Sequence, residues 1–403
     1  MKSTRKNIPL VAFDIRPLQT ESRYRGVGIL ILNIVKYMLK KDLSFDILFV
    51  ANAGIELPSF VVESKHRILY VKRNFMISKV DKKIVWIPEK AFLKNSLKKA
   101  GVDLYFCTIF AEPNYPILIP DDELRVISWI YDLTPFKFKD LFRESLSQKS
   151  IGYSFEKKMD DASKSNHILT LSETSADEIA EKMGIRRDSI DIIYPGIGFE
   201  SVDNVVCERD FFARYPDLGR YIFYIGGFDE RKNLKRVLSA FSLLVNDVRD
   251  INFVIGGNIR EDDGQYINLK EHISELGIVD RVIFTGFIEE RFLPCFYSHA
   301  KFLSFVTLDE GFGIPPIEAM FCKTPVLSSN VSCIPEVVGD AALLVDPYSI
   351  EDILSGMQKL LLRKDLVEQL IRNGTVRSKR FTWDRGVDAV IESIEKILYE
   401  HSD

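Results

Sequence analysis

Short apolar runs alternate with helical patterns along most of this chain, and each run has the length of a strand. Seven runs in the first half predict strands at residues 10–14, 47–51, 67–71, 104–107, 126–131, 167–171 and 191–194. Between them, residues 33–41 and 155–165 repeat their apolar positions with the period of a helix. Strands that alternate with helices in this way are typical of parallel sheets in α/β proteins.

The same alternation restarts after the turn-rich segment 194–198, which is the best candidate for a linker. Further strands are predicted at residues 221–225, 251–255, 282–285, 301–306 and 325–329. A chain of 403 residues exceeds one ordinary domain. We therefore predict two Rossmann-like parallel-sheet domains facing across a cleft, residues 1–196 and 197–380. Residues 381–403 would form a C-terminal helix that returns to the first domain.

Residues 310–318 are the most informative stretch, because seven residues separate the carboxylates of Glu310 and Glu318. Gly311 and Gly313 let backbone approach a ligand closely, and two prolines suit the first turn of a helix containing Glu318. The N-terminus of that helix would attract an anion, typically a phosphate. Since two acids would repel a phosphate, they suit the neutral hydroxyls of a sugar. Together these groups fit a nucleotide sugar.

An isolated pair of this kind also has a structural interpretation, as one solvated glutamate and one glutamate that stabilises a helix dipole. The context favours function, because the pair lies between the strands predicted at 301–306 and 325–329. That order of elements makes a βαβ unit, in which ligands bind at the carboxyl ends of the strands.

A second group of candidate residues follows the strand at 221–225, where Gly226 and Gly227 lead to Arg231 and Lys232 before a helix from about Leu234. Cations at a helix N-terminus oppose its dipole and therefore cost stability unless an anion lies nearby. A diphosphate fits, with arginine as a bidentate partner and lysine as a compact charge. The alternative is an exposed basic turn.

Two features of the first half are weaker. Gly26 and Gly28 precede the helical pattern and could admit a sugar or phosphate against backbone N–H groups, although a plain loop is an equal alternative. Asp132 ends a predicted strand and could contact an acceptor hydroxyl at the cleft edge, or it could form an Asx turn. The chain has no Asp-x-Asp sequence, the usual carboxylate site for a sugar-nucleotide-bound divalent ion, so we expect metal-independent chemistry.

Composition narrows the class of protein. The chain is 46% hydrophobic and 28% charged, which is typical of soluble globular proteins. No apolar run has the length of a membrane span, and the N-terminus shows no signal-peptide pattern. Five cysteines without a C-x-x-C pair predict reduced thiols in a cytoplasmic protein, and scattered histidines disfavour metal binding.

Charge is distributed unevenly along the chain. Residues 1–100 carry 20 Lys and Arg against 8 Asp and Glu, whereas the whole chain has a net charge of −4. Lysines recur at positions 82, 83, 90, 94, 98 and 99. They form either ordinary solvated faces or a basic surface that rests on anionic phospholipid. Nucleic acid is disfavoured as a partner, because no aromatic platform or known module accompanies the charge.

With these motifs in order, the chain resembles the GT4 family of retaining glycosyltransferases, which have the GT-B fold. The matching segments cover almost the whole chain and are residues 25–28, 172–175, 194–197, 226–233, 284–287, 310–320 and 324–326. The resemblance implies transfer of a sugar from a nucleotide diphosphate with retention of anomeric configuration. The first domain would lie on the acceptor side and the second would bind the nucleotide sugar.

The resemblance also implies roles for single residues. Glu318 would hold the ribose, Glu310 the donor sugar, and Arg231 with Lys232 the diphosphate. Further donor contacts would come from Gly28, Gly227, Phe287, Gly311, Phe312, Gly313 and Ile314. Catalytic roles fall to Glu310, Arg231, Lys232 and Asp132. Family members commonly lack a dedicated base, and the departing phosphate oxygen takes the acceptor proton.

Two positions depart from the family pattern. Tyr131 stands where a histidine usually precedes the residue corresponding to Asp132, which puts any imidazole contribution in doubt, and Lys323 replaces a small residue. Segments 14–18 and 329–332 look most like members that handle mannose or rhamnose in bacterial surface polysaccharides. GDP-mannose is therefore favoured over UDP- or dTDP-sugars as donor, without a further cofactor.

The resulting expectation is a cytoplasmic glycosyltransferase, peripheral on the inner face of the plasma membrane, that extends a saccharide or lipid-linked glycan such as an O-antigen. Two alternatives stay open: a nucleotide-sugar epimerase on the same fold, and a non-catalytic nucleotide-sugar-binding subunit. A retaining glycosidase also needs paired acids, but here the acids lie beside a predicted phosphate-binding helix.

Overall fold

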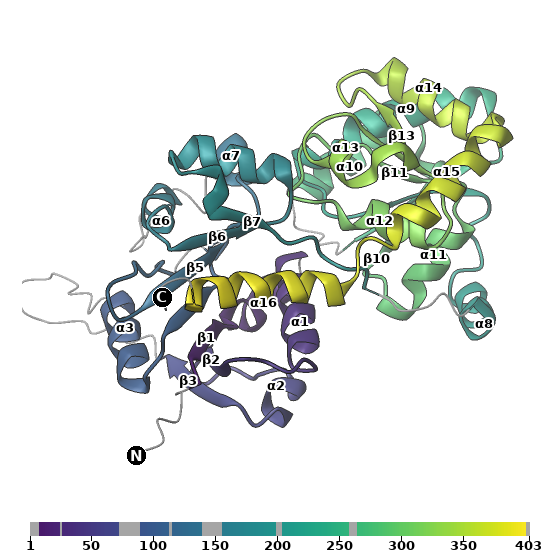
Figure 1. The fold of residues 1–403 in the computed structure, drawn as a ribbon. Coiled ribbons are helices and arrows are strands. Elements are labelled where there is room, and N and C mark those ends of the chain that lie inside the picture. Colours follow the sequence, from purple (N-terminus) through teal and green to yellow (C-terminus); the bar gives the residue numbers. More distant parts are fainter. Residues whose placement is uncertain are drawn as a thin grey trace, which may run out of the picture. The chain divides into compact units, whose positions relative to one another are not determined.

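Two parallel sheets organise the chain, each in its own compact unit (Figure 1). The computed structural model describes residues 8–24, 26–71, 89–112, 115–138, 155–198, 204–257 and 264–399. Unit 1 comprises Met1–Pro195 and Trp383–Asp403, and unit 2 comprises Gly196–Thr382. The chain therefore enters unit 2 once, leaves it once, and ends in unit 1.

The sheet of unit 1 has seven parallel strands in the order β3-β2-β1-β4-β5-β6-β7. Its strands are β1 (Leu10–Asp14), β2 (Asp46–Asn52), β3 (Arg67–Val71), β4 (Leu104–Cys107), β5 (Arg125–Trp129), β6 (His167–Thr170) and β7 (Ile190–Ile192). Successive side chains alternate between its faces, so Val11 and Phe13 join one apolar core while Leu10 and Ala12 join the other. Burial on both faces explains why these strands are almost continuously apolar.

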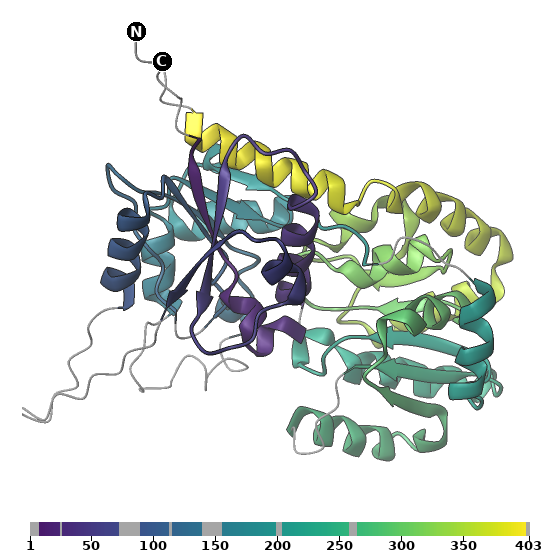
Figure 2. The same cartoon turned by 90° about the horizontal axis from the view of Figure 1, so that it is seen from below.

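Helices cover both faces of this sheet. They are α1 (Gly26–Met38), α2 (Ser59–Glu63), α3 (Glu89–Ala100), α4 (Thr134–Lys137), α6 (Phe155–Ala162), α7 (Glu173–Met183) and α16 (Trp383–Tyr399). The C-terminal helix α16 packs beside α1, and its Trp383, Val387 and Val390 belong to the same apolar core as Phe13 (Figure 2). Two segments from opposite ends of the chain therefore complete one core.

The sheet of unit 2 has six parallel strands in the order β10-β9-β8-β11-β12-β13. They are β8 (Tyr221–Ile225), β9 (Asn252–Gly256), β10 (Val282–Gly286), β11 (Leu303–Phe305), β12 (Val326–Ser329) and β13 (Leu343–Val345). From β8, the strands β9 and β10 follow toward one edge of the sheet, and β11, β12 and β13 then follow toward the other edge. The topological switch point therefore lies between β8 and β11, which is where ligands bind in open α/β sheets.

The principal helices of unit 2 are α8 (Asn204–Arg214), α9 (Leu234–Asp247), α10 (Gly264–Glu275), α11 (Leu293–His299), α12 (Ile314–Phe321), α13 (Ile334–Val338), α14 (Ile350–Leu362) and α15 (Lys364–Ser378). Helices α9, α10, α14 and α15 contribute to one buried apolar cluster with the sheet. Helix α12 contacts α15 and connects β11 to β12. Its position between two central strands brings its N-terminus to the carboxyl edge of the sheet.

The predicted fold class of two Rossmann-like parallel-sheet units is confirmed. Two local expectations were wrong. Helix α1 begins at Gly26 rather than near residue 33, because its glycines belong to the first helical turn and not to a loop. Strand β13 was not predicted, because three apolar residues do not show a period.

Cysteine chemistry also differs from the expectation of five reduced thiols. Cys107, Cys322 and Cys333 are free and buried, but Cys295 is disulfide-bonded. A disulfide needs two Cβ atoms about 4 Å apart in the fold, and spacing along the chain does not reveal that approach. In the described part of the chain, no helix combines the length and apolarity needed to span a membrane.

Candidate active site

Two loops meet at the switch point of unit 2 and bring together the charged residues predicted from separate motifs. The loop after β8 contains the short 3-10 helix η4 (Glu230–Lys232), and the loop after β11 contains Glu310. The N–H of Leu308 donates to the carbonyl of Arg231 at 2.7 Å, so the two loops are hydrogen-bonded through their backbones. The positions of their side chains are therefore linked.

Glu310 lies between the two predicted phosphate-binding cations. Nη1 of Arg231 lies 3.0 Å from its Oε2, and Nζ of Lys232 lies 2.6 Å from its Oε1. The guanidinium of Arg231 also contacts Asp229, with Nε 3.1 Å from Oδ1, and donates from Nη1 to the carbonyl of Asp309 at 3.1 Å. Two cations and two carboxylates therefore balance one another in this cluster.

These ion pairs set the ionisation of Glu310. Burial by itself would raise the pKa of Glu310, but the charges of Lys232 and Arg231 outweigh burial and lower it. Glu310 is thus an anion with both oxygens engaged by cations. A carboxylate in this state accepts hydrogen bonds and is a poor base, because removing a proton from a ligand would mean losing these pairs.

The turn after η4 is held by Asn233, which has the left-handed backbone conformation with φ +61°. Its side-chain amide donates to the carbonyls of Val306 at 3.1 Å and Pro347 at 2.7 Å. Asparagine tolerates this conformation better than most residues. The turn is thereby fixed against the end of β11, with Arg231 and Lys232 directed to the Glu310 loop.

Helix α12 begins after Gly313, whose φ of +88° suits glycine, and Glu318 lies one turn inside it. Pro315 and Pro316 occupy the first turn and have no N–H, so they remove two of the four free donors that a helix N-terminus usually offers. Ile314 and the glycine loop keep their backbone N–H groups. An anion at this helix end would therefore depend on the loop N–H groups more than on the helix itself.

Glu318 is buried and receives a hydrogen bond from the hydroxyl of Tyr297, at 2.8 Å. Burial raises its pKa to about 7; the Tyr297 hydroxyl opposes this rise, and the charge of Glu290 adds to it. The backbone of Gly198 also hydrogen-bonds to Glu318 and lowers its pKa. Glu318 therefore titrates near neutrality, unlike Glu310.

Glycines lie side by side at the carboxyl ends of three neighbouring strands. The N–H of Gly226 donates to Gly256, and that of Gly257 donates to Gly286, both at 3.1 Å. A Cβ on Gly257 would lie 2.4 Å from the carbonyl oxygen of Gly226, so the packing itself requires glycine there. Gly227 follows at this edge, with its carbonyl bound by the Tyr224 hydroxyl at 2.6 Å.

The two predicted aromatic contacts of the donor are placed differently. Phe287, directly after β10, is 69% exposed, so its ring is accessible to a ligand. Phe312 is 4% exposed and packs edge-on against Phe381, with ring centroids 5.4 Å apart. Any contact of Phe312 with a donor would therefore come from its backbone.

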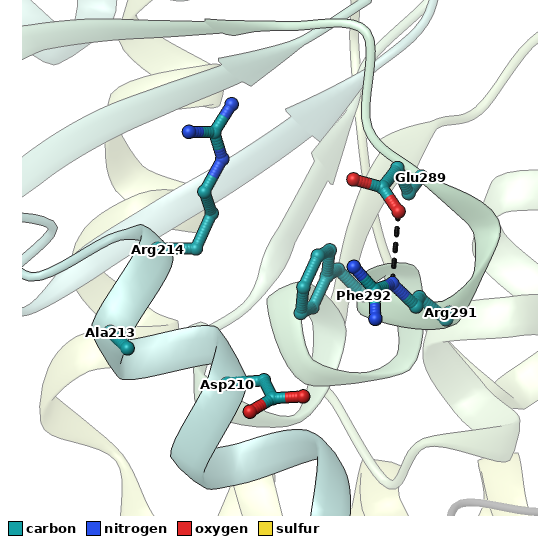
Figure 3. Close-up of a pocket in the computed structure, with 6 residues that line it drawn as sticks. All are labelled: Asp210, Ala213, Arg214, Glu289, Arg291 and Phe292. Atoms are coloured by element: carbon teal, nitrogen blue, oxygen red, sulfur yellow. Dashed lines mark hydrogen bonds and ion pairs between the residues drawn. The ribbon is translucent and has the colours of Figure 1, made fainter.

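A pocket of about 370 Å³ lies apart from these residues, between α8 and the 3-10 helix η6 (Glu290–Phe292) (Figure 3). It is lined by Asp210, Ala213, Arg214, Glu289, Arg291 and Phe292. Its Arg291 is paired with Glu289, Nε to Oε2 at 2.9 Å, and lies over the ring of Phe292. None of the predicted donor-binding residues lines it.

In unit 1, Gly28 has a packing role. A Cβ at this position would lie 2.3 Å from the carbonyl oxygen of Ser22 and 2.4 Å from Cα of Arg23, both in the 3-10 helix η2 (Glu21–Tyr24). Gly28 therefore lets α1 pack directly on the backbone of η2. Arg25, which belongs to the same motif, lies outside the described residues.

Asp132 and Tyr131 follow β5. The Asp132 carboxylate accepts a hydrogen bond from the N–H of Thr134 at 2.9 Å, which is the Asx turn weighed as an alternative from the sequence. Tyr131 is buried, and its hydroxyl donates to the carbonyl of Thr108 at 2.8 Å. Burial raises the pKa of Tyr131. The phenol therefore does not replace the missing imidazole as an acid or base.

Comparison with known proteins identifies the family. Residues 210–377 match the family model "Glycosyl transferases group 1" and so cover most of unit 2. Unit 2 is therefore similar to group 1 glycosyltransferases. The family resemblance found in the sequence is thereby confirmed.

Two curated relatives are mannosyltransferases of Escherichia coli. The serotype-specific mannosyltransferase WbdA is 25% identical over 295 residues, which are 71% of this chain and 35% of that protein. O-antigen chain mannosyltransferase B is 26% identical over 332 residues, or 79% of this chain and 76% of that one. The chain thus spans about a third of the length of the first relative.

The fold is shared with solved glycosyltransferase structures. Sucrose-phosphate synthase from Thermosynechococcus elongatus superposes with a TM-score of 0.69 at 16% identity, over 97% of this chain and 100% of that one. At this identity the likeness shows the fold, which is the GT-B arrangement of two Rossmann-like domains.

Three contacts in the two units could not have been found from sequence. Tyr297 contacts Glu318 from a separate helix, 21 residues away, and nothing in its surroundings marks it. Ser332 contacts the Glu310 loop from the segment after β12. In unit 1, the guanidinium of Arg16 is fully buried and pairs with Asp14, Nη2 to Oδ2 at 2.6 Å, although the sequence showed only that both lie near the end of β1.

Three of the lysines assigned to the predicted basic surface form ion pairs in the structure. In α3, Nζ of Lys90 lies 2.8 Å from Asp161, and Nζ of Lys94 lies 2.8 Å from Asp121. Lys98 pairs with Asp121 at 2.9 Å and with Glu123 at 2.8 Å. Lys82 and Lys83 lie outside the described residues. Acidic residues that follow later in the chain thus offset the charge of this helix.

Proposed function

We propose that this glycosyltransferase moves a hexose from a nucleotide-diphosphate sugar to a saccharide or lipid-linked glycan, with retention of configuration and without a divalent metal. The observation that carries the proposal is the cluster of Arg231, Lys232 and Glu310 at the switch point of unit 2. It offers two fixed cations beside a fixed anion, at the edge where open α/β sheets bind ligands.

The cations suit the diphosphate of the donor. Breaking the bond from the sugar to the diphosphate leaves additional negative charge on the phosphate oxygen, and prepositioned cations stabilise that charge as it develops. Arg231 and Lys232 are held in place by Glu310 and the backbone of the neighbouring loop, so little reorganisation is needed. They therefore supply the role that a divalent ion has in metal-dependent transferases.

The two glutamates would have different roles. Glu310, as a fixed anion, would accept hydrogen bonds from hydroxyls of the donor sugar. Glu318, buried one turn inside α12, would accept those of the ribose. Phe287 would cover the nucleobase with its exposed ring, and the loop Gly311–Gly313 with Ile314 would offer N–H groups to the phosphates.

The chemical step would need no base from the protein. The acceptor oxygen forms a bond to the anomeric carbon on the face that the diphosphate leaves, and the bond from that carbon to the phosphate oxygen breaks. The acceptor proton passes to the departing phosphate oxygen. Asp132 would contact the acceptor, whereas its Asx turn to Thr134 would orient it.

Mannose is the favoured sugar and GDP-mannose the favoured donor, since curated relatives along most of the chain are mannosyltransferases. Their names include O-antigen synthesis, which supports a role in bacterial surface polysaccharide. Such a role would place the protein in the cytoplasm, at the inner face of the plasma membrane. Because three of the four lysines of α3 are ion-paired, anionic lipid would have to contact other cations.

A transfer assay tests the proposal. Purified protein is incubated with GDP-mannose, UDP-glucose or dTDP-rhamnose and a mannose-containing oligosaccharide, with EDTA or with Mg²⁺, and the product anomer is assigned by NMR. We expect an α-linked product from GDP-mannose that EDTA does not suppress. Acceptor-independent conversion of the donor sugar would favour an epimerase, and donor binding without either reaction would favour a non-catalytic subunit.

A further inference from the structure

Ser332 has an unusual backbone conformation at the edge of the proposed donor site. It follows β12 and has φ +57°, in the left-handed region that glycine adopts most easily. A serine at such a position is disfavoured by the contact of its Cβ with the backbone. Glycine would fit with less strain, so the serine side chain must provide something that glycine cannot.

The hydroxyl of Ser332 connects three groups of the Glu310 loop. It lies 2.8 Å from Oδ1 of Asp309 and 3.1 Å from the carbonyl oxygen of Glu310. It also accepts a hydrogen bond from the N–H of Glu310 at 3.3 Å. The neighbouring Cys333 adds to this contact, with its sulfur 3.1 Å from the same carbonyl oxygen.

Ser332 contacts the loop at a point that lies outside regular secondary structure. Glu310 lies between the end of β11 and the start of α12, where no ladder of strand or helix holds its backbone. Asp309 is 4% exposed, so its carboxylate needs a nearby donor, which Ser332 supplies. The orientation of the Glu310 backbone therefore depends on a residue from the opposite side of the β11–α12–β12 unit.

We propose that Ser332 is a positioning residue that fixes Glu310 against the transferred sugar. This inference rests on the proposed function of Glu310. Ser332 acts on the sugar through the loop and makes no contact with the reacting atoms itself. Its removal should therefore affect the sugar more than the diphosphate, which Arg231 and Lys232 hold.

The test compares Ser332→Gly with Ser332→Ala. Glycine removes the hydroxyl and relieves the left-handed strain, whereas alanine removes the hydroxyl and keeps the strain. Ser328→Ala is the matched control, because the Ser328 hydroxyl is also buried and donates to a backbone carbonyl, that of Phe305 at 2.7 Å, away from Glu310. Melting temperature, binding of GDP, and kcat and KM with GDP-mannose are measured for each.

We expect kcat of Ser332→Gly to fall about ten- to a hundredfold. Its melting temperature should lie above that of Ser332→Ala, because glycine relieves the left-handed strain. The dissociation constant of GDP should change by less than about threefold. Ser332→Ala should show the same loss of kcat at a lower melting temperature. Ser328→Ala should lower the melting temperature and leave kcat in place. This combination separates positioning from general stability.

Coupling provides a second readout. If the Ser332 hydroxyl acts through Asp309, the loss of kcat in the double variant Ser332→Ala with Asp309→Ala should be no greater than the larger single loss. Turnover in Ser332→Gly and Ser332→Ala within about threefold of the unchanged protein would overturn this inference alone. An unchanged protein that neither binds nor transfers any tested donor sugar would overturn the proposed function and the inference with it.

Discussion

Nζ of Lys232 lies 2.6 Å from Oε1 of Glu310, which is 78 residues further along the chain. Together with Arg231, this pair turns two separately predicted contacts of a nucleotide sugar into one electrostatic unit. The anion keeps the cations in place and partly neutralises them. Substitution of any member therefore changes both the charge offered to a donor and the stability of unit 2.

Removal of Glu310's charge should abolish most transfer. Glu310→Gln keeps the side-chain volume but loses both ion pairs, and we expect kcat to fall about a hundredfold, the scale seen when one electrostatic contact to a transition state is removed. Donor turnover under saturating GDP-mannose measures this. Lys235→Ala, an exposed cation on α9, is the control and should remain active. Near-normal turnover in Glu310→Gln would contradict the assignment.

Removal of both cations should destabilise the protein as well as inactivate it. Arg231→Ala with Lys232→Ala leaves Glu310 buried without a partner, which costs about 3–5 kcal/mol in comparable buried pairs. The triple variant that adds Glu310→Gln should recover much of this stability and remain inactive. Urea unfolding followed by circular dichroism measures the difference. A double variant as stable as the unchanged protein would show that water reaches Glu310.

Glu318 should make stability depend on pH near neutrality. Burial raises the pKa of Glu318 to about 7 in the folded state, from an ordinary value of 4.5. Between these two pH values the folded chain keeps the proton of Glu318, whereas the unfolded chain has lost it. This contribution is fully present below about pH 4.5 and is lost as pH rises through about 7, a change of about 3 kcal/mol. Glu318→Gln lacks it and should gain stability relative to the unchanged protein as pH rises.

The matched control for this titration is Glu290→Gln, since Glu290 is an exposed carboxylate near Glu318. Its stability difference from the unchanged protein should vary much less with pH. Denaturant midpoints of the three proteins between pH 5 and pH 8 measure both differences. A Glu318→Gln difference that is flat across this range would place the pKa of Glu318 outside it.

Two glycines of α1 should respond in opposite directions to alanine. Gly28→Ala brings Cβ against the backbone of Ser22 and Arg23 and should cost at least about 1–3 kcal/mol. Gly26→Ala meets nothing within 4 Å and should be neutral or stabilising by up to about 1 kcal/mol, as alanine is in a helix. Trp129 and Trp383 are buried in the core of unit 1, so their fluorescence reports its unfolding. Equal effects would contradict the packing role of Gly28.

Arg16 should be important for the stability of unit 1. Its guanidinium is fully buried and pairs with Asp14 and with Glu89, the latter with Nη1 2.6 Å from Oε1. Arg16→Met leaves Asp14 as a buried charge without its counter-ion, at a cost of about 3–5 kcal/mol. Adding Asp14→Asn should restore part of this loss, measured again by tryptophan fluorescence. If Asp14→Asn made the loss larger, Asp14 would be stabilised by other groups, such as the Tyr105 hydroxyl.

Much of the fold followed from the sequence because its strands are short, apolar and often end in glycine. The predicted bounds of β1, β3, β4 and β8 match the structure. Gly26 and Gly28 misled the prediction of α1, since their low helix propensity is outweighed by close packing on η2. Strand β13 is recognisable only through its pairing with β12.

The candidate site was predictable by residue type but not by contact. Glycines, prolines and charges marked Glu310, Glu318, Arg231 and Lys232, because phosphates and sugars need those groups. The sequence could not show that Glu310 pairs with both cations, since pairing depends on which strands are adjacent. It also could not show the environment of Glu318, whose pKa is set by burial beneath Tyr297 and Gly198.

The return of α16 to unit 1 has a consequence for synthesis. The core shared by α1 and α16 contains Trp383, Val387, Val390 and Ile394, so unit 1 lacks part of its interior until the last helix has been made. Unit 2 is continuous from Gly196 to Thr382, so all of its residues are synthesised before α16. A chain that ends before residue 383 would therefore contain all of unit 2 but only part of the core of unit 1.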